Sequence, residues 1–340
     1  MRATHASSAF APQGACGCAL PRLPAQGTVV AVIRLSQPFV QDEHLVGMGI
    51  KVKKMIATRS AEFPRLFPEA GRMSQTEHAT IPVFKDHRDV FGKWHGGVYA
   101  IGNFDGLHIG HQALIQETIR IAAETNSPPA IMTFDPHPRE LFDPSASPFR
   151  LATSLQKMQE LAKLGLGLCL NQYFDMNFAK LTPEAFAEQV LMQSLWATHV
   201  VVGADFRFGS RQSGNTEILT QLCADLGIGL TVIDQIRVAG NVASSSLIRD
   251  LIASGEMSAV ANVLGRPWSV VARAEISDAG LFFDLSDYTK IGRGEYTVRV
   301  HGIVCRATLS ESCEGRQILT VSKEKGWIAA NYARAEFISS

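Results

Sequence analysis

The decapeptide GNFDGLHIGH at residues 102–111 holds two histidines, three residues apart, among three glycines and one acid. Imidazoles donate hydrogen bonds to phosphate oxygens as charge builds in a transition state, and glycines let the backbone approach a ligand closely. A helix that begins near His108 would add free N–H groups and the positive end of its dipole, with His111 on the same side. The stretch therefore predicts a nucleotide-phosphate site. The alternative is a glycine-rich turn with one capping and one core histidine.

The elements that would position this decapeptide alternate between short apolar runs and helical patterns. Strands are expected at residues 97–102, 129–134, 198–204 and 227–234, and helices at residues 110–126, 153–165 and 182–195, with a pair of short helices over 244–264. Such alternation predicts an α/β fold, a Rossmann-like domain whose parallel sheet is covered on both faces. The decapeptide then lies beyond the carboxyl end of a strand, where open sheets bind ligands.

The chain divides into three segments by composition. Residues 1–72 are rich in Ala, Pro, Gly, Ser and Arg without periodicity, which favours a disordered extension. A start at Met73 would remove it, and an organelle-type targeting peptide is the alternative. Residues 73–265 make up the expected α/β domain. Residues 266–340 carry short alternating strands and predict a small β-barrel-like domain.

Charge and cysteine usage exclude several classes of protein. The 32 basic residues balance 32 acidic ones, whereas a nucleic-acid partner usually requires a basic stripe. No apolar stretch approaches the roughly 18 residues of a membrane helix. Six scattered cysteines favour reduced thiols, and Cys16 and Cys18 alone are too few for a metal site. We therefore expect a cytoplasmic protein without a nucleic-acid or membrane partner.

Five ordered segments carry a family resemblance. GNFDGLHIGH resembles the His-x-Gly-His signature of the nucleotidyltransferase superfamily, in the form found in the FMN adenylyltransferase half of bacterial bifunctional riboflavin kinase/FAD synthetases. The other segments similar to that family are MTFDPHPRELF (132–142), FDMNFAKLTPEAF (174–186), VVGADFRFGSRQSGN (201–215) and ASSSLIRDLIASGEMSAVANVLGRPW (243–268). The resemblance covers about residues 97–268 and implies a FAD synthetase.

The resemblance assigns roles to individual residues. The residues expected to contact the transition state are His108, His111 and Arg249. The residues expected to bind ATP are Gly102, Asn103, Phe104, Asp105, Gly110, Ser244, Ser245 and Ser246. The residues expected to bind the flavin are Asp135, Pro136, His137, Asp205, Phe206 and Phe208. No metal ligand is assigned, and Mg²⁺ is expected to arrive with ATP.

The implied reaction is attack of the FMN phosphate on the α-phosphorus of ATP, which yields FAD and pyrophosphate. FMN and ATP would be the only partners implied. The Ser-rich segment departs from the family, because Ala243, Ser246 and Leu247 replace an aliphatic residue, a threonine and a frequent arginine. Ser246 keeps the hydroxyl, whereas Leu247 removes a charge, which would weaken nucleotide affinity.

The C-terminal domain departs further from the bifunctional family. Residues 266–294 lack the Gly-Phe-Pro-Thr-Ala-Asn segment that marks the kinase half, although GEYTVRV (294–300) resembles the strand that follows it. The late acidic segment that would supply the kinase base is also absent. We therefore expect a degenerate, shortened barrel, half built where the chain ends, without riboflavin kinase activity.

Two other functions stay open at this point. One is a nucleotidyltransferase for another phosphate, such as phosphopantetheine or glycerol phosphate, although segments 132–138 and 203–209 favour a flavin. The other is a non-catalytic regulator that binds flavin or nucleotide, which the lost kinase motif and the altered Ser-rich segment would suit.

Overall fold

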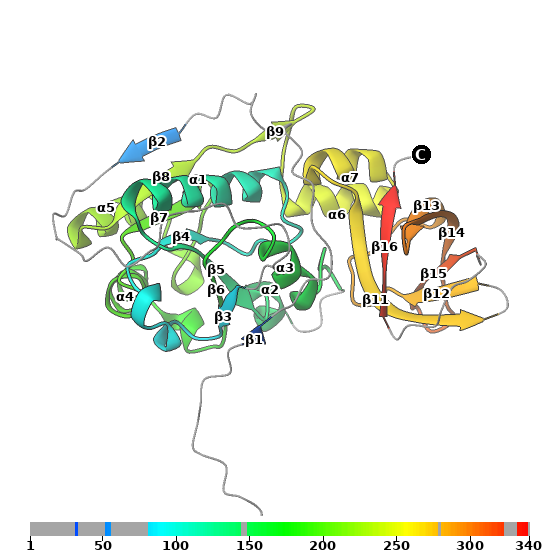
Figure 1. Cartoon of the computed structure of the whole chain (residues 1–340), viewed down its shortest axis with the longest axis horizontal. Helices are drawn as coiled ribbons and strands as arrows, with labels where there is room; N and C mark the ends of the chain where they lie inside the picture. Colours follow the sequence, from blue (N-terminus) through cyan, green and yellow to red (C-terminus); the bar gives the residue numbers. More distant parts are fainter. Residues whose placement is uncertain are drawn as a thin grey trace, which may run out of the picture.

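The computed structural model describes residues 31–32, 52–55, 81–143, 148–277, 280–322 and 332–338. Figure 1 shows an α/β domain and a β-barrel, with helices α6 and α7 between them. The strands of the α/β domain are β1 (Ala31–Val32), β2 (Val52–Met55), β3 (Pro82–Phe84), β4 (Val98–Ile101), β5 (Pro129–Asp135), β6 (Leu168–Tyr173), β7 (His199–Gly203), β8 (Gly229–Ile233), β9 (Arg237–Val238) and β10 (Asn241–Val242). Its helices are α1 (Ile109–Thr125), α2 (Pro138–Phe142), α3 (Ser154–Leu161), α4 (Pro183–Ala185), α5 (Thr216–Leu226), α6 (Ser245–Ser254) and α7 (Met257–Leu264), together with short 3₁₀ turns η2 (His87–Asp89), η3 (Gly92–Trp94), η4 (Phe178–Lys180) and η6 (Ser210–Gln212) and the π-helical stretch η5 (Phe186–Ser194).

The central sheet has the order β1-β3-β6-β5-β4-β7-β8-β2. Strands β3, β6, β5, β4, β7 and β8 run parallel, while β1 and β2 add antiparallel pairs at the two edges. The parallel strands are mostly apolar because both faces are covered, and all four residues of β4 are buried. Asn171 and Gln172 of β6 are buried polar exceptions. The predicted α/β fold with a parallel sheet is confirmed.

Alternate residues of each strand face two separate cores. Tyr99 and Ile101 of β4 pack with Phe186 and Val190 of η5, on one face of the sheet. Val98 and Ala100 belong to the other core, which also contains residues of α1 and α3. A single strand therefore anchors both layers of helices, and its carboxyl end is fixed in position.

The order of the strands reverses beside β4. The chain runs from β4 through β5 to β6 on one side of β4, whereas β7 and β8 lie on the other side. The loops that leave β4 and β7 therefore diverge at the carboxyl end of the sheet. Open α/β sheets bind ligands in the crevice at this topological switch point.

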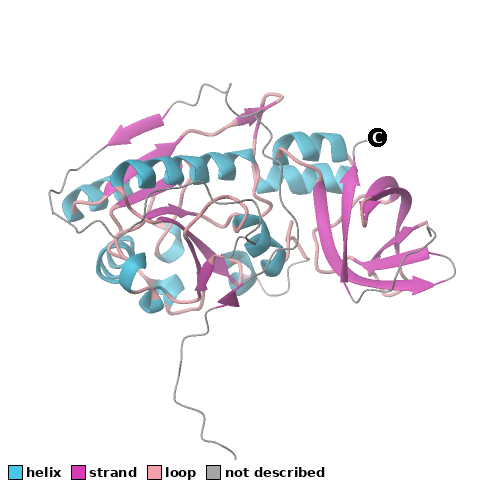
Figure 2. Cartoon of the chain, viewed as in Figure 1, coloured by secondary structure: helices cyan, strands magenta, loops and turns pink. Residues whose placement is uncertain are grey.

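The C-terminal region is a closed barrel of six strands in the order β11-β12-β15-β14-β13-β16. These strands are β11 (Trp268–Ser277), β12 (Gly280–Asp284), β13 (Gly294–Val300), β14 (Ile303–Glu311), β15 (Gln317–Val321) and β16 (Tyr332–Ile338), and Figure 2 shows them in magenta beside the helix pair α6 and α7. The barrel-like domain is confirmed, but the expectation that it ends half built is wrong. Closure occurs because β16 pairs with both β11 and β13.

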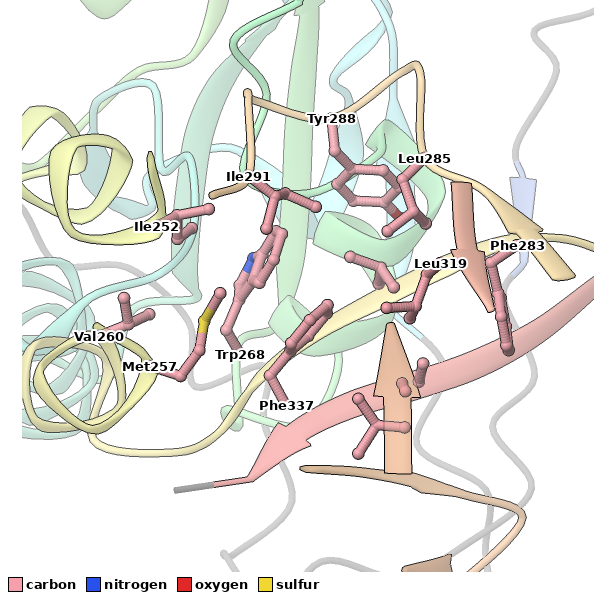
Figure 3. Packing of buried hydrophobic residues seen from close by; sticks show 14 of the residues in the cluster. Ile252, Met257, Val260, Trp268, Phe283, Leu285, Tyr288, Ile291, Leu319 and Phe337 are labelled. Carbon is pink, nitrogen blue, oxygen red and sulfur yellow. The ribbon is translucent and has the colours of Figure 1, made fainter. Parts of the chain in front are cut away.

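The barrel shares its hydrophobic core with helices α6 and α7. Ile252 of α6 and Val260 of α7 belong to the same cluster of buried residues as Trp268 and Phe337 of the barrel, and Figure 3 shows these side chains side by side. The helix pair therefore connects the two regions through packing, and α6 carries the Ser-rich segment on its opposite end.

The predicted N-terminal extension is described only at β1 and β2. The remainder of residues 1–72, with Met73, Cys16 and Cys18, lies outside the described residues, so its predicted disorder stays a prediction. Within the described ranges, no helix combines the length and apolar character needed to cross a membrane.

Candidate active site

The decapeptide forms the end of β4, a tight loop and the start of α1. His108 is the N-cap of α1, and its Nδ1 accepts a hydrogen bond from the backbone N–H of His111 at 3.3 Å. Because a backbone N–H can only donate, His108 Nδ1 carries no proton, and the neutral ring has its N–H at Nε2. The two imidazole rings stack with centroids 3.7 Å apart. The prediction that both rings lie on one side of the helix start is confirmed.

Gly110 lies close against the His108 ring. A Cβ at Gly110 would lie 3.0 Å from His108 Nδ1 and 3.1 Å from its Cε1, closer than such contacts normally come. The sequence indicated that the glycines admit a ligand. At Gly110 the neighbour that comes close is the histidine itself, so this glycine sets the ring's position over the first turn.

The loop before α1 has a strained backbone. Phe104 and Leu107 both have φ near +50°, in the left-handed region that non-glycine residues rarely adopt. The carbonyl of Asn103 accepts hydrogen bonds from Thr133 Oγ1 at 2.9 Å and from Lys157 Nζ at 3.4 Å. These bonds to β5 and α3 hold the loop in its unusual conformation.

Burial keeps both histidines neutral. Desolvation lowers the pKa of His108 to about 4. Desolvation also lowers the pKa of His111, and the nearby His108 and Lys157 lower it further. The Nδ1 atom of His111 is buried and has no hydrogen-bond partner. A buried polar atom without a partner is costly, and a ligand with donors or acceptors could satisfy it.

The Ser-rich segment begins helix α6 opposite α1. Ser244 is the N-cap and accepts a hydrogen bond from the backbone N–H of Leu247 at 3.2 Å. Ser245 donates to the carbonyl of Asp105 at 2.8 Å, which ties the two helix starts together. Ser246 is exposed. The hydroxyls of Ser244 and Ser245 therefore bond the protein's own backbone, whereas Ser246 is the most exposed of the three serines.

Asp105 and Arg249 form a shielded ion pair between the loop before α1 and helix α6. Arg249 Nη2 lies 2.7 Å from Asp105 Oδ2, and Arg249 Nε donates to the carbonyl of Phe149 at 2.7 Å. Asp105 also accepts a hydrogen bond from the backbone N–H of Leu151 at 3.1 Å. Burial raises the pKa of Asp105, and the positive charge of Arg249 opposes that shift. The carboxylate orients the guanidinium toward the site.

These elements enclose a cavity of about 1040 Å³. The predicted site residues that line it are Gly102, Asn103, Phe104, His108, Gly110, His111, His137, Asp205, Phe206, Phe208, Ser244, Ser245, Ser246 and Arg249. Residues from all three predicted groups thus meet around one space. Asp105, Asp135 and Pro136 do not line it.

Asp135 has structural contacts instead. Its carboxylate accepts a hydrogen bond from Ser154 Oγ at 3.0 Å and pairs with Lys85 Nζ at 3.4 Å. The neighbouring His137 caps α2, and its Nδ1 accepts from the backbone N–H of Arg139 at 3.1 Å. The end of β5 is therefore fixed by Asp135, while His137 reaches the cavity.

One wall of the cavity is aromatic. Phe206 and Phe208 have nearly parallel rings with centroids 5.5 Å apart, and Phe208 is buried in the core as expected for one of the pair. Further lining residues that the sequence reasoning did not single out are Phe134, Phe142, Phe149, Phe174, Phe178 and Phe186. Several lie within the motifs quoted above, so the signal was present as repeated phenylalanines. Flat apolar ligands suit such a wall.

Basic residues missed by the sequence reasoning also line the cavity. They are Arg139, Lys180, Arg207 and Arg211. Arg139 lies over the Phe149 ring at 4.9 Å from its centroid, and Arg249 lies over the same ring at 5.2 Å. Together with two helix N-termini, these cations favour an anionic ligand of high charge.

The described side chains do not form a metal site of their own. No group of three or more His, Cys, Asp or Glu residues lies together within the ranges that the structure covers.

Comparison with known proteins finds a family whose model matches most of the α/β domain. Residues 91–247 match the family model described as FAD synthetase. A bifunctional riboflavin kinase/FMN adenylyltransferase from Escherichia coli strain K12 is 33% identical over 183 residues, which cover 54% of this chain and 58% of that protein. The protein of the same description from Listeria monocytogenes is 34% identical over 173 residues, covering 51% and 54%. The chain thus matches little more than half the length of these relatives.

A solved structure shares the fold. The crystal structure of a macrolide-efflux protein from Streptococcus pneumoniae aligns with a TM-score of 0.64 at 20% identity, covering 75% of this chain and 88% of that one. At this level of identity the likeness concerns the fold alone.

Proposed function

We propose that this chain, whose residues 91–247 match the FAD synthetase family model, is an FMN adenylyltransferase that transfers AMP from ATP to FMN. The observation that carries the proposal is the cavity at the switch point, which two helix N-termini and the stacked histidine rings face together. Its aromatic wall suits an isoalloxazine ring, and its cationic wall suits phosphates.

In the proposed reaction an oxygen of the FMN phosphate attacks the α-phosphorus of ATP. The bond from that phosphorus to the bridging oxygen breaks, and pyrophosphate leaves with the electron pair. His108 donates from Nε2, because its Nδ1 is already engaged by the His111 N–H. Arg249, held by Asp105, stabilises the charge that develops on the departing pyrophosphate. Catalysis then rests on positioning and charge stabilisation, without a covalent enzyme intermediate.

Magnesium enters the proposal as part of the substrate. The described side chains offer no ligand cluster, and the ion would be held by the triphosphate while it neutralises part of the negative charge. The partners in this proposal are the small molecules Mg·ATP and FMN.

Riboflavin kinase activity is proposed to be absent. Residues 266–294 lack the family's kinase segment, and buried side chains fill the barrel interior. FMN would then come from a separate kinase that phosphorylates riboflavin. Formation of FMN from riboflavin and Mg·ATP by the purified chain would overturn this part of the proposal.

The deciding experiment incubates the full chain with FMN, ATP and MgCl₂ and separates the flavins by chromatography. The proposal expects FAD and an equal amount of pyrophosphate. Binding of FMN and ATP without turnover would instead identify a regulator. Turnover of phosphopantetheine or glycerol phosphate in place of FMN would identify a different nucleotidyltransferase.

A further inference from the structure

Residues 149–151 cross between the candidate active site and the barrel, and we call them the connecting segment. On the site side, its first carbonyl, that of Phe149, accepts a hydrogen bond from Arg249 Nε at 2.7 Å. Its last N–H, that of Leu151, donates to Asp105 at 3.1 Å. The connecting segment therefore bonds both partners of the Asp105–Arg249 ion pair.

On the barrel side, the other two carbonyls of the connecting segment are also bonded. The carbonyl of Arg150 accepts from the backbone N–H of Thr289 at 2.9 Å. The carbonyl of Leu151 accepts from the indole Nε1–H of Trp268 at 2.9 Å, and this bond is buried. Each of the three carbonyls thus has a partner, one from α6 and two from the barrel.

Trp268 is held rigidly at the start of β11. Its ring stacks on Phe337 with centroids 5.0 Å apart and meets Tyr288 edge-on at 6.1 Å. Figure 3 shows the indole between these rings and the α6–α7 pair. Only 3% of its surface is exposed. A donor whose ring cannot turn fixes the position of whatever accepts from it.

Arg266 makes a second link from the same end of the barrel. It lies between α7 and β11, and its Nη2 donates to the carbonyl of Gly106 at 3.1 Å. Gly106 follows Asp105 in the strained loop and has φ near +80°. The barrel end thus holds both the loop that carries Asp105 and the connecting segment that bonds Arg249.

We propose that Trp268 and Arg266 are positioning residues for adenylyl transfer, acting through the connecting segment and the Gly106 loop on the Asp105–Arg249 pair. The inference rests on the proposed function and deepens it. It gives the barrel a role in adenylyl transfer that is unrelated to kinase chemistry. Neither residue lines the large cavity, but each holds a backbone segment that orients Arg249. A small displacement of a charge-stabilising group lowers the rate of the chemical step more than substrate binding.

The test compares full-length Trp268→Phe and Arg266→Met with Arg334→Met. Trp268→Phe keeps an aromatic ring and removes the N–H donor, and Arg266→Met removes the bond to Gly106. Arg334→Met is the matched control, because Arg334 bonds Glu160 of α3 from the barrel at 2.7 Å without touching the connecting segment. We expect kcat to fall about tenfold in the first two variants, with the KM for ATP changed less than twofold. The control should keep the wild-type kcat.

Melting curves identify which variants fold, and kcat is compared among those that do. If Trp268→Phe fails to fold, the kcat of Arg266→Met alone tests the inference. Wild-type kcat in every folded test variant, or an equal loss in Arg334→Met, would overturn the inference while leaving the proposed function intact. A wild-type chain that forms no FAD would overturn the proposed function itself. In that case binding of inorganic pyrophosphate decides: weaker binding by the test variants than by Arg334→Met supports the positioning role, and equal binding refutes it.

Discussion

The cavity of the α/β domain and the interior of the barrel differ in the kinds of groups that they bury. Around the cavity, the α/β domain holds a left-handed Phe104, desolvated neutral imidazoles and a histidine nitrogen without a partner. The barrel instead fills its interior with apolar side chains such as Phe283 and Leu319, both fully buried, as Figure 3 shows. Phe104 and His111 both line the cavity where a ligand would bind, whereas the barrel interior has only to pack.

Because of this difference, we expect stability and chemistry to respond to different mutations in this chain. Substitutions in the barrel interior should act mainly on the free energy of unfolding. Substitutions at the cavity should act mainly on turnover. Substitutions that disturb the connecting segment should affect both the free energy of unfolding and turnover.

The largest effect is expected from Phe283→Ala in the barrel. Phe283 is fully buried among the residues labelled in Figure 3, and removing a buried phenylalanine leaves a cavity that costs about 3–5 kcal/mol. Urea denaturation should report this loss, while FAD formation per folded molecule stays near wild type. An unfolding free energy equal to that of the wild type would show that the Phe283 ring does not stabilise the barrel.

His111→Ala should have the next largest effect, and on turnover. The change removes one of the two stacked rings at the start of α1, and loss of one group that stabilises a transition state costs about 100–1000-fold in kcat. The control is His301→Asn at the turn between β13 and β14. Retention of wild-type turnover by His111→Ala would remove this ring from the proposed mechanism.

The pH dependence of stability should arise largely at the cavity. The pKa values of His108 and His137 are lowered to about 4 in the folded chain, against 6.5 for an ordinary histidine. The unfolded chain therefore binds protons first as the pH falls, so these groups' contribution is full above about pH 6.5 and is lost progressively toward pH 4. Each contributes on the order of 3 kcal/mol over that window.

Urea titrations at several pH values between 7 and 4 measure this slope. His108→Gln should flatten it relative to wild type, because one of the desolvated imidazoles is gone. An unchanged slope would mean that the imidazole at position 108 is not desolvated in solution.

Gly110→Ala should give the smallest effect. Alanine in a helix usually stabilises it by about 0.5–1 kcal/mol relative to glycine, but here the new Cβ would lie 3.0 Å from His108 Nδ1. We expect unchanged or slightly raised thermal stability with about a tenfold lower kcat. A stable variant with normal kcat would show that the position of the His108 ring is unimportant.

Several elements could be predicted from local pattern, and others could not. The helix over 182–195 begins at the predicted cap, since Thr182 accepts from the backbone N–H of Ala185. Strand β6 was missed because its buried Asn171 and Gln172 interrupt the apolar run. Closure of the barrel was missed because it depends on pairing between Trp268 and Phe337, and strand pairing at that separation leaves no periodic signal.

The sequence predicted which residues form the candidate site, but not which of them bond to one another. The sequence indicated charges at Asp105 and Arg249, and nothing local shows that they meet across 144 residues. Asp105 was therefore assigned to ATP, whereas its carboxylate bonds Arg249 and Leu151. Similarly, Gly110 was assigned to the ligand and does line the cavity, but its close approach to the His108 ring could not be predicted from the sequence.

The hydrogen bond from Trp268 to Leu151 spans 117 residues, and this separation has a consequence for the order of assembly. Closing a longer stretch of chain costs more entropy, so pairings of distant segments form after local ones. During synthesis the decapeptide and α1 would leave the ribosome well before residue 268. A growing chain would then gain the support of Arg249 from the barrel late, after the α/β domain has formed.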